Sequence, residues 1–369
     1  MSDIQIGGTE LVSVAADGQV GAPEGRRVRG RFTNARLVEA ATLMRRVWDG
    51  DLRASLELRE ALSTSDFGSL FGATLDRQLL AAYQAAPSVW QRFATRRVLK
   101  DFRPASFFDI LGGQAILPEV GQLAEYENRE VDTDELTLRV AKRGARFSLS
   151  WETLVNDDLD AFRDLPQRLA QAARNTEDFV AARLVEVDGA PNTAFFTGNT
   201  ALSGNPALTS ESLEAALTNL GNRRDVDGNP IITGGRVLMV GPALEMTAKR
   251  IINATEVRFT DGNRTVITGN TLSGAVELVV NPWLTSPTAW YVLPTPGGAR
   301  PAVAVGFLRG YETPEIRVKA DTGSMVGGGQ VAPTDGSFDI DDIQYRARHV
   351  LGGGTLLKDA ALASTGAGS

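Results

Sequence analysis

The amino-acid sequence predicts an α+β protein, and three observations indicate this fold class. Residues 122–149 have the polar pattern of a long two-stranded hairpin, and residues 164–185 have the apolar spacing of one long helix. Residues 209–310 then alternate between helical and strand-like patterns. With 369 residues, of which 43% are hydrophobic and 22% charged, the chain is large enough to bury one or two hydrophobic cores.

The composition excludes several kinds of chemistry. Because the chain has no cysteine, it has no disulfides, thiolate nucleophiles, zinc–cysteine sites or iron–sulfur clusters. The net charge of -7 argues against a dedicated nucleic-acid binder, since affinity for phosphate comes from clustered Lys and Arg. The sequence contains no run of about 18 apolar residues and no signal-peptide layout, so we expect no membrane partner and a place in the cytoplasm where it is made.

Residues 1–65 are expected to form an N-terminal arm. Residues 1–30 are Gly-rich and without hydrophobic period, which is typical of an extended segment. The segment ends in a basic stretch formed by Arg26, Arg27, Arg29 and Arg31. Two helical stretches follow, over 37–47 and 56–62, and their apolar faces are too small for them to fold alone.

Residues 66–110 begin with a helix and end in an extended segment. The helix is expected over Gly72–Ala85, where Leu75, Leu79, Leu80 and Tyr83 follow a helical period. Trp90 and Phe93 then precede an extended stretch that continues to Ile110.

Residues 111–151 are expected to form a long hairpin, with strands over 122–131 and 136–149 and a turn at the Asp-Thr-Asp stretch 132–134. Its charges are sorted between the two arms. The acidic residues of the first arm and the tip are Glu125, Glu127, Glu130, Asp132, Asp134 and Glu135. The basic residues of the second arm are Arg139, Lys142, Arg143 and Arg146. Because an isolated two-stranded ribbon is marginally stable in water, we expect it to lie on a neighbouring subunit.

Residues 164–185 are expected to form a single long helix. Asp164 can cap its N-terminus, and Pro166 suits its first turn. Its expected buried stripe consists of Leu165, Leu169, Ala172, Thr176, Val180 and Leu184. About twenty residues give a rod of roughly 30 Å, which is long for a domain of this size. A helix that packs only inside its own domain remains the alternative.

Residues 209–310 have the pattern of a separate α/β unit. A helix with leucines at 213, 217 and 220 ends at Gly221, and Pro242 begins a second helix that ends near Asn253. The expected strands are 236–240, 256–260, 264–267, 276–280, 290–293 and 302–307. Outside this unit, strands are expected over 315–320 and 338–349, joined by the Gly-rich loop 322–337.

Possible catalytic and metal sites have simpler structural explanations. The single histidine, His349, lies on an expected strand and cannot form a metal cluster alone. The glycine triplets 327–329 and 352–354 match neither a phosphate-binding loop nor a dinucleotide fingerprint, and we interpret them as flexible connections. Helix caps, turns and ion pairs between subunits explain three carboxylate clusters: Asp157, Asp158 and Asp160; Asp225 and Asp227; and Asp339, Asp341 and Asp342.

Three motifs stand in an order that is typical of a known family. They are VLKDFRPASFFDILG at 98–112, FSLSWETLVNDDLDAF at 147–162 and FDIDDIQYRARHVLGGG at 338–354. With these motifs, the chain resembles the Hong Kong 97-type capsid fold of tailed-phage major capsid proteins and encapsulins, in its Mu-like, protease-linked branch. The resemblance covers about residues 64–365 and leaves the arm poorly matched.

The resemblance implies a division of the chain into the parts of that fold. These are the N-terminal arm (1–65), the first part of a peripheral domain (66–110), an extended loop (111–151), the peripheral domain with a spine helix (152–208), an axial domain (209–310), the closing strands and Gly-rich loop of the peripheral domain (311–350) and a C-terminal tail that returns to the axial domain (351–369).

The resemblance also implies a function, that of a major capsid protein of a tailed bacteriophage. Such subunits form hexamers and pentamers and assemble in the bacterial cytoplasm into an icosahedral shell, the virion capsid, around double-stranded DNA. The implied partners are other copies of the chain, a scaffold or protease, a portal and decoration proteins. No catalytic residue, cofactor or metal is expected.

The candidate contact residues come from the extended loop and the arm. Contacts with neighbouring subunits are expected at Glu125, Glu127, Arg129, Glu130, Asp132, Asp134, Glu135, Arg139, Lys142 and Arg143. Contacts with DNA or a scaffold are possible at Arg26, Arg27, Arg29 and Arg31, although a solvated arm fits as well. Some family members cross-link neighbours through a lysine of the loop. Here its only lysine, Lys142, is away from the expected tip, so we expect non-covalent contacts.

Two alternatives remain open. One is an encapsulin-like compartment around a cargo enzyme. It shares the fold, and the sequence separates it poorly from a phage capsid. A carboxylate-dependent hydrolase built on residues 209–310 is a remote alternative from another functional class.

Overall fold

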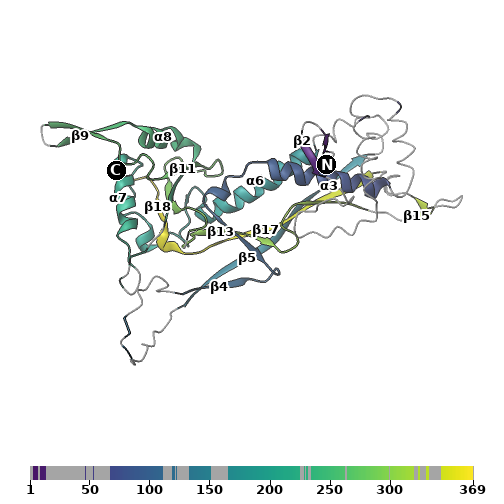
Figure 1. Ribbon diagram of the computed structural model, residues 1–369, viewed down its shortest axis with the longest axis horizontal. Coiled ribbons are helices and arrows are strands. Elements are labelled where there is room, and N and C mark those ends of the chain that lie inside the picture. Colours follow the sequence, from purple (N-terminus) through teal and green to yellow (C-terminus); the bar gives the residue numbers. More distant parts are fainter. Residues whose placement is uncertain are drawn as a thin grey trace. The chain divides into compact units, whose positions relative to one another are not determined.

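The structure is a computed structural model in which the chain forms two compact units, each assembled from separate segments (Figure 1). Unit 1 comprises Met1–Pro87, Lys142–Asn175 and Arg309–Val350, and unit 2 comprises Ser88–Ala141, Thr176–Leu308 and Leu351–Ser369. The structure describes residues 3–6, 9–13, 46, 53, 67–110, 119–120, 122, 133–150, 165–224, 228, 230–231, 234–261, 264–298, 300–319, 323–324, 330–331 and 342–368.

A four-stranded sheet occupies the centre of unit 2. Its strand order is β11 (Glu277–Val280), β8 (Arg236–Val240), β12 (Trp290–Pro294) and β18 (Leu362–Ser364). β8 is parallel to β11 and antiparallel to β12, and β12 is antiparallel to β18. All five residues of β12 are buried, so apolar groups cover both faces of the sheet.

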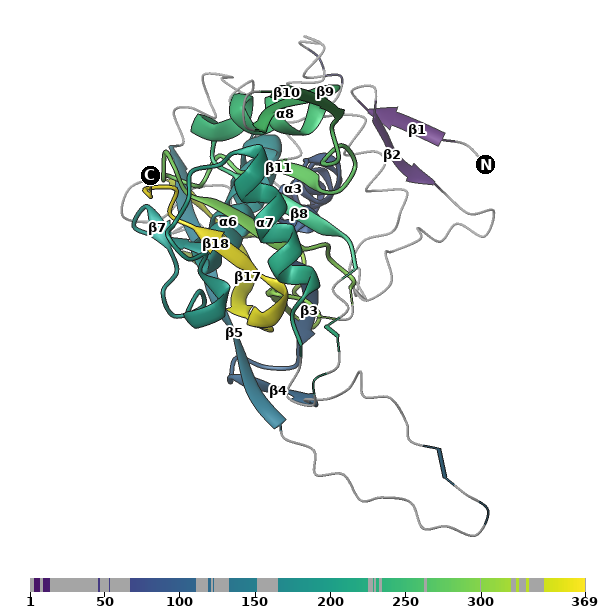
Figure 2. The same ribbon diagram turned by 90° about the vertical axis from the view of Figure 1, so that its left-hand side faces the viewer.

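Two helices cover one face of this sheet, α7 (Ser210–Gly221) and α8 (Glu245–Asn253). Leu213 of α7 and Ala248 of α8 share a hydrophobic cluster with Leu238 of β8, and Figure 2 shows α7 beside β8 and β18. α7 begins with reciprocal capping bonds: the hydroxyl of Thr209 accepts from the Ser212 N–H, and the Ser212 hydroxyl accepts from the Thr209 N–H. Both expected helices are therefore confirmed.

The strands that the sequence predicts over 209–310 are all present, but the last of them has different partners. β9 (Glu256–Asp261) and β10 (Arg264–Gly269) form a hairpin of their own. β13 (Val303–Leu308) lies between β3 (Thr95–Leu99) and β17 (Asp342–Thr355) rather than in the four-stranded sheet. The apolar run of β13 correctly indicated a fully buried strand, but such a run does not say which strands flank it.

α6 (Leu165–Val185) confirms the expected long helix and part of its expected stripe: Val180 is buried, and Leu169 and Leu184 pack against hydrophobic clusters. Ala172 is exposed, however, and Arg174, Glu177 and Asp178 are buried. The prediction missed these three because it assigned charged residues to the solvent, as is usual. Here each of the three has partners that make burial possible.

The two buried carboxylates of α6 bind the segment around Trp90 in unit 2. Asp178 accepts hydrogen bonds from the backbone N–H groups of Val89 and Trp90, at 2.9 and 2.8 Å. Glu177 accepts from the indole N–H of Trp90 at 2.7 Å. Trp90 is 2% exposed, so these bonds satisfy donors that water cannot reach.

The glycine triplet 352–354 is part of β17 and not the flexible connection that the sequence suggested. A Cβ atom at Gly352 would collide with the carbonyl oxygen of Arg139 on β5 (Thr133–Ser150), and one at Gly354 would lie 2.8 Å from the carbonyl oxygen of Thr137. At Gly353, a Cβ atom would lie 2.7 Å from the side chain of Leu184. The glycines therefore allow the close approach of β17 to β5 and α6.

Unit 1 has its own small core. It combines Leu79 and Tyr83 of α3 (Phe67–Ala85) with Ala170 of α6, Ile316 of β14 (Glu315–Val318) and Tyr345 of β17. The buried Arg174 donates from Nε to the carbonyl oxygen of Tyr83, and its guanidinium carbon lies 3.8 Å from the centroid of that ring. α3 confirms the expected helix and begins earlier than expected.

The N-terminal segment and the Gly-rich loop contain short hairpins. β1 (Asp3–Ile6) pairs with β2 (Thr9–Ser13), where an extended segment was expected. β15 (Gly323–Ser324) pairs with β16 (Gln330–Val331). Of the two helical stretches expected over 37–47 and 56–62, only Arg46 is among the described residues, and it is helical.

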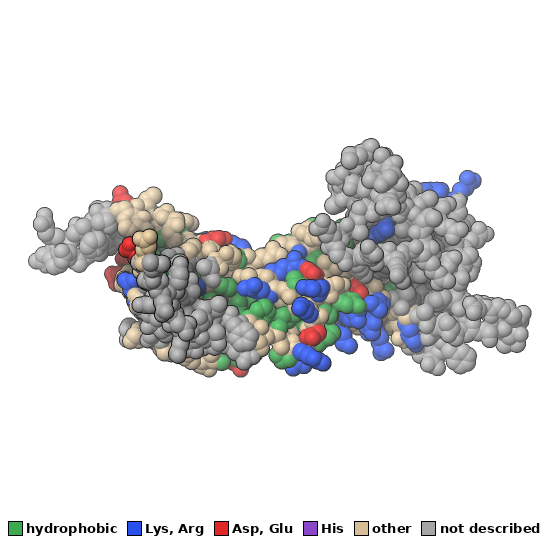
Figure 3. Space-filling view, turned by 60° about the horizontal axis from the view of Figure 1, so that its bottom comes forward, with side chains coloured by type: hydrophobic (Ala, Val, Ile, Leu, Met, Phe, Trp, Pro, Cys, Tyr) green, Lys and Arg blue, Asp and Glu red, His purple; other side chains and the backbone are tan. Residues whose placement is uncertain are grey.

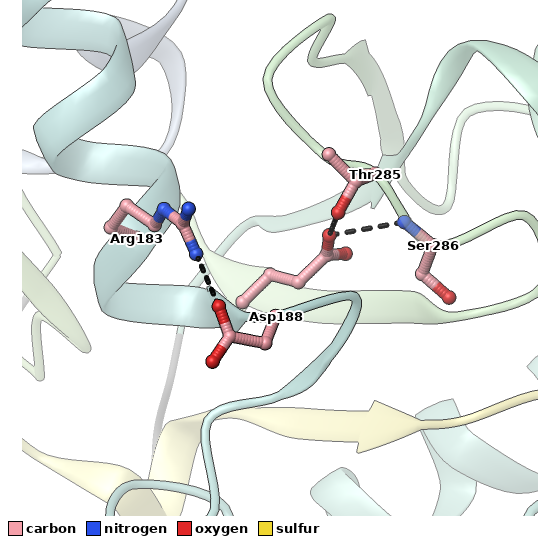
Figure 4. A network of polar contacts seen from close by, with 5 residues as sticks. Arg183, Asp188, Thr285 and Ser286 are labelled. Atoms are coloured by element: carbon pink, nitrogen blue, oxygen red, sulfur yellow. Dashed lines mark hydrogen bonds and ion pairs between the residues drawn. The ribbon is translucent and has the colours of Figure 1, made fainter.

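A buried carboxylate links the end of α6 to a loop of unit 2. Glu186 begins β6 (Glu186–Val187), which turns through Asp188 and Gly189, both at positive φ, into β7 (Ala190–Pro191). The Glu186 carboxylate accepts from Thr285 N–H at 2.6 Å, Thr285 Oγ1 at 2.9 Å, Ser286 N–H at 3.0 Å and Tyr291 OH at 3.0 Å. Figure 4 shows the contacts with Thr285 and Ser286, next to the Arg183–Asp188 ion pair.

The tyrosine in this network remains a hydrogen-bond donor. Burial, together with the charge and the hydrogen bond of Glu186, raises the pKa of Tyr291 above its ordinary value. The hydroxyl therefore stays protonated at any pH at which the protein is handled.

We expect Gly352→Ala to lower the free energy of unfolding by about 3 kcal/mol or more, because the added methyl group meets a neighbouring backbone that cannot move aside. Urea unfolding of the soluble subunit measures this effect. Gly269→Ala is the matched control, because a Cβ atom there has nothing within 4 Å. Equal stability of the two variants would contradict the tight β17–β5 contact.

We expect Glu186→Ala to cost about 3 kcal/mol, because it leaves several buried donors without their charged acceptor. Asp188→Asn removes only the exposed ion pair with Arg183 and keeps a residue that tolerates positive φ. It should change stability by less than about 0.5 kcal/mol. Thermal unfolding followed by circular dichroism compares the two, and similar losses would refute the central role of Glu186.

Candidate assembly surfaces

β4 (Ala105–Ile110) and β5 are neighbours at the edge of a six-stranded sheet, in which β5 also lies next to β17. They are antiparallel, and the register runs from Ala105 opposite Leu138 to Ile110 opposite Thr133. The expected turn at 132–134 is therefore wrong, because Thr133 and Asp134 are ladder residues. Asp favours turns, and Thr does so more weakly, but cross-strand pairing with β4 overrides that local preference.

The structure places five of the expected contact residues on β5. Arg139, Lys142 and Arg143 are exposed, whereas Asp134 and Glu135 lie opposite Asp109 and Phe108. The remaining loop candidates lie outside the described residues: Glu125, Glu127, Arg129, Glu130 and Asp132. The four arm candidates also lie outside them: Arg26, Arg27, Arg29 and Arg31.

The residues in the middle of β5 are exposed, although the backbone of β17 lies close to β5 at Gly144. A strand with a core on one side alternates between buried and exposed residues, as Leu138 and Val140 do with their neighbours. From Ala141 to Arg146, however, all residues are exposed. The stretch 139–146 also contains four basic residues, so the exposed residues of β5 are strongly positive.

A second charged surface lies on unit 1, where β14 pairs with β17. Glu315 stands opposite Arg348, and Arg317 stands opposite Arg346, so these four side chains share one face of the ladder. Ile316 lies on the other face, in the core. We call Glu315, Arg317, Arg346 and Arg348 the arginine cluster.

Glu315 is the centre of the arginine cluster. Its side chain is 8% exposed, accepts from Nε of Arg317 at 3.1 Å and also forms an ion pair with Arg348. The guanidinium carbon of Arg348 lies 5.2 Å from the ring centroid of Tyr311. One carboxylate thus pairs with two guanidinium groups. Lys and Arg side chains also gather on the face of the molecule shown in Figure 3.

Sequence reasoning identified both strands of this cluster but not their shared charge. The signal was present in the alternation of EIRV at 315–318 and QYRARH at 344–349, which places every second residue on one face. The pairing register was the missing information, because it decides which charges meet.

The core beneath the cluster is aromatic. Phe147 of β5 stacks on Tyr345 of β17, with ring centroids 5.4 Å apart. Burial raises the pKa of Tyr345 above its ordinary value, so its hydroxyl stays neutral. His349 is buried beside Tyr83, with the two rings edge to face.

The part of the chain that the structure describes contains no group of three His, Asp or Glu side chains that could hold a metal ion. Of the three carboxylate clusters in the sequence, Asp342 alone is described; it is buried, and its oxygens accept from Gln344. Among the described helices, none has the length and apolar character to cross a membrane.

Comparison with known proteins assigns the family. A family model described as phage capsid protein matches residues 133–364, which is more than half of the chain. The chain belongs to this phage capsid protein family. The match begins at the first residue of β5 and ends at the last residue of β18, so it includes both charged surfaces. No curated protein matches the sequence.

Several solved structures are similar at low sequence identity. The capsid of cyanophage P-SCSP1u is 13% identical, with 75% of this chain and 87% of that chain covered and a TM-score of 0.44. Mycobacterium phage Che8 is 14% identical, with 72% and 85% covered and a TM-score of 0.41. The SrpI encapsulin of Synechococcus elongatus is 11% identical, with 78% and 94% covered and a TM-score of 0.41. The assignment rests on the family match alone.

Membership of a phage capsid protein family makes this chain a component of a virion capsid, with a structural task. Its α+β fold combines the helices and sheets of the two units described above. For such a protein, the surfaces that matter are those that meet other subunits.

We expect Glu315→Gln to lower the free energy of unfolding by about 2 kcal/mol, because Arg317 and Arg348 lose the carboxylate that they share. Glu256→Gln, at an exposed position, is the control and should leave stability unchanged. Urea unfolding of the two variants provides the comparison. If both behaved like the wild type, Glu315 would not hold the cluster together.

Proposed function

We propose that this chain is the major capsid protein of a tailed double-stranded DNA bacteriophage, of the Hong Kong 97 type. Its subunits form hexamers and pentamers that assemble into an icosahedral shell around the genome. The observation that carries the proposal, beyond the family match, is the stretch 141–146 of β5, whose six residues are all exposed although the strand belongs to a sheet. Exposed strand residues become buried when neighbouring subunits cover them.

The parts of that fold are assigned to the chain as follows. Residues 111–151 are the extended loop, α6 is the spine helix, and the four-stranded sheet with α7 and α8 forms the axial domain. β18 pairs with β12 in that sheet, which supports the return of the C-terminal segment to the axial domain. The arm, 1–65, extends to neighbouring subunits.

The shell is held together by non-covalent contacts that symmetry repeats. Each contact is weak, but a closed shell repeats it at every equivalent position. We further propose that the chain belongs to the Mu-like, protease-linked branch. Its partners are then a scaffold or protease, a portal and decoration proteins, and assembly takes place in the bacterial cytoplasm.

Electron microscopy of the purified protein, with any scaffold that it requires, tests the proposal. Closed icosahedral shells are the expected result, and a strictly monomeric protein under these conditions would overturn it. Images of shells from infected cells also distinguish the two kinds of compartment. DNA in the lumen supports the phage capsid, whereas a protein cargo indicates an encapsulin-like shell.

Reversing two acidic charges of the loop, in Glu127→Lys/Glu130→Lys, should leave the subunit folded and reduce the yield of particles at least about tenfold. The reason is that each shell contains many copies of the altered contact. Sedimentation separates particles from subunits, and circular dichroism reports folding. Glu211→Lys/Glu256→Lys changes the net charge equally at exposed positions outside the loop. Normal particle yield from the loop variant would contradict its role.

A further inference from the structure

The arginine cluster contains a like-charge contact that does not help the isolated subunit to fold. Arg317 and Arg346 are directly opposite each other across the β14–β17 ladder, and both are exposed. Like charges in this position destabilise a sheet. The nearby carboxylate of Glu315 is already shared between Arg317 and Arg348.

Neighbouring residues add to the positive charge of this face. Because Phe147 stacks on the core residue Tyr345, alternation along β5 directs Arg146 to the opposite side, which is the side of the arginine cluster. At the two ends of β14, Glu312 and Lys319 cancel in formal charge. With the carboxylates of Glu315 and Asp342 counted, the four arginines still leave a formal charge of 4 - 2 = +2 on this face, which suits an anionic partner.

We propose that the arginine cluster binds the acidic loop segment of a second copy of this chain, residues 125–135. This inference rests on the proposed function and names the partner of its loop. The segment contains six carboxylates and one basic residue, Arg129, so its formal charge is 1 - 6 = -5. It is a dense acidic run in a chain whose net charge is -7.

The spacing of the charges also matches. Arg346 and Arg348 are two residues apart on one face of β17. The acidic segment has the same two-residue spacing, at Glu125 and Glu127 and again along the run Glu130, Asp132 and Asp134. In an extended strand, residues two apart lie on the same side and are separated by about 6.6 Å. An extended acidic segment can therefore place successive carboxylates against successive guanidinium groups.

A peptide with the sequence of residues 122–135 serves as the probe for a binding experiment with the full-length subunit. Fluorescence anisotropy should show binding that weakens with salt, and Arg346→Glu should weaken it at least about tenfold. Arg168→Glu, an exposed position on α6 with the same change of charge, should leave the affinity unchanged. Equal affinities for wild-type and Arg346→Glu subunits would overturn the proposal.

A short DNA duplex tests the other anionic partner. If the duplex bound through Arg346 and the peptide did not bind, the cluster would be a DNA contact and the proposal would be wrong. Binding of the peptide, with displacement only by excess duplex, supports the proposal.

Assembly of the full chain separates this inference from the function on which it rests. Arg346→Glu places a carboxylate opposite Arg317, so the melting temperature of the isolated subunit should be equal to or above that of the wild type, whereas the particle yield should fall at least about tenfold. Adding Glu127→Lys/Glu130→Lys should restore part of the yield. If the wild type and Arg346→Glu both form normal shells, the inference is overturned and the proposed function stands. Failure of the wild type to form shells, with peptide binding intact, would overturn the proposed function alone.

Discussion

The close approach of β17 to β5 is the constraint on which much of the structure depends. β17 contributes residues up to Val350 to unit 1 and residues from Leu351 to unit 2. In unit 2 its glycines lie against the backbone of β5 and the side chains of α6. In unit 1 the same strand supplies Tyr345 to the core and two arginines to the charged face. A side chain in the triplet would therefore disturb a strand on which both units rely.

Burial of charge is the second organising feature. Glu177, Asp178 and Glu186 lie on or just after one helix, and each binds donors from a distant segment of the chain. Charged acceptors of this kind specify which segment lies where, because a buried N–H group left without a partner is costly. Hydrophobic contacts alone are less selective.

The sequence predicts the individual elements better than their partners. The two helices and the strands over 209–310 follow from spacing, caps and glycine stops, all of which are local signals. The partners of β13, the turn of the hairpin and the buried face of α6 depend on contacts between distant segments. The glycine triplet 352–354 was wrongly predicted to be a flexible connection, because Gly occurs both in flexible loops and where two backbones lie close together. Likewise, the arginine cluster exists only through the register of β14 and β17.

The pairing of β3 with β13 has a kinetic consequence. Thr95 lies opposite Ala304, so the parallel ladder joins residues 304 - 95 = 209 positions apart in the chain. Contacts between such distant residues form slowly, because the chain loses the entropy of closing a long loop before the contacts stabilise it. Until then, β13 has an unpaired apolar edge, which is prone to aggregation when many copies are synthesised together. A chain in which this ladder has not yet closed is therefore more prone to aggregate than the folded subunit.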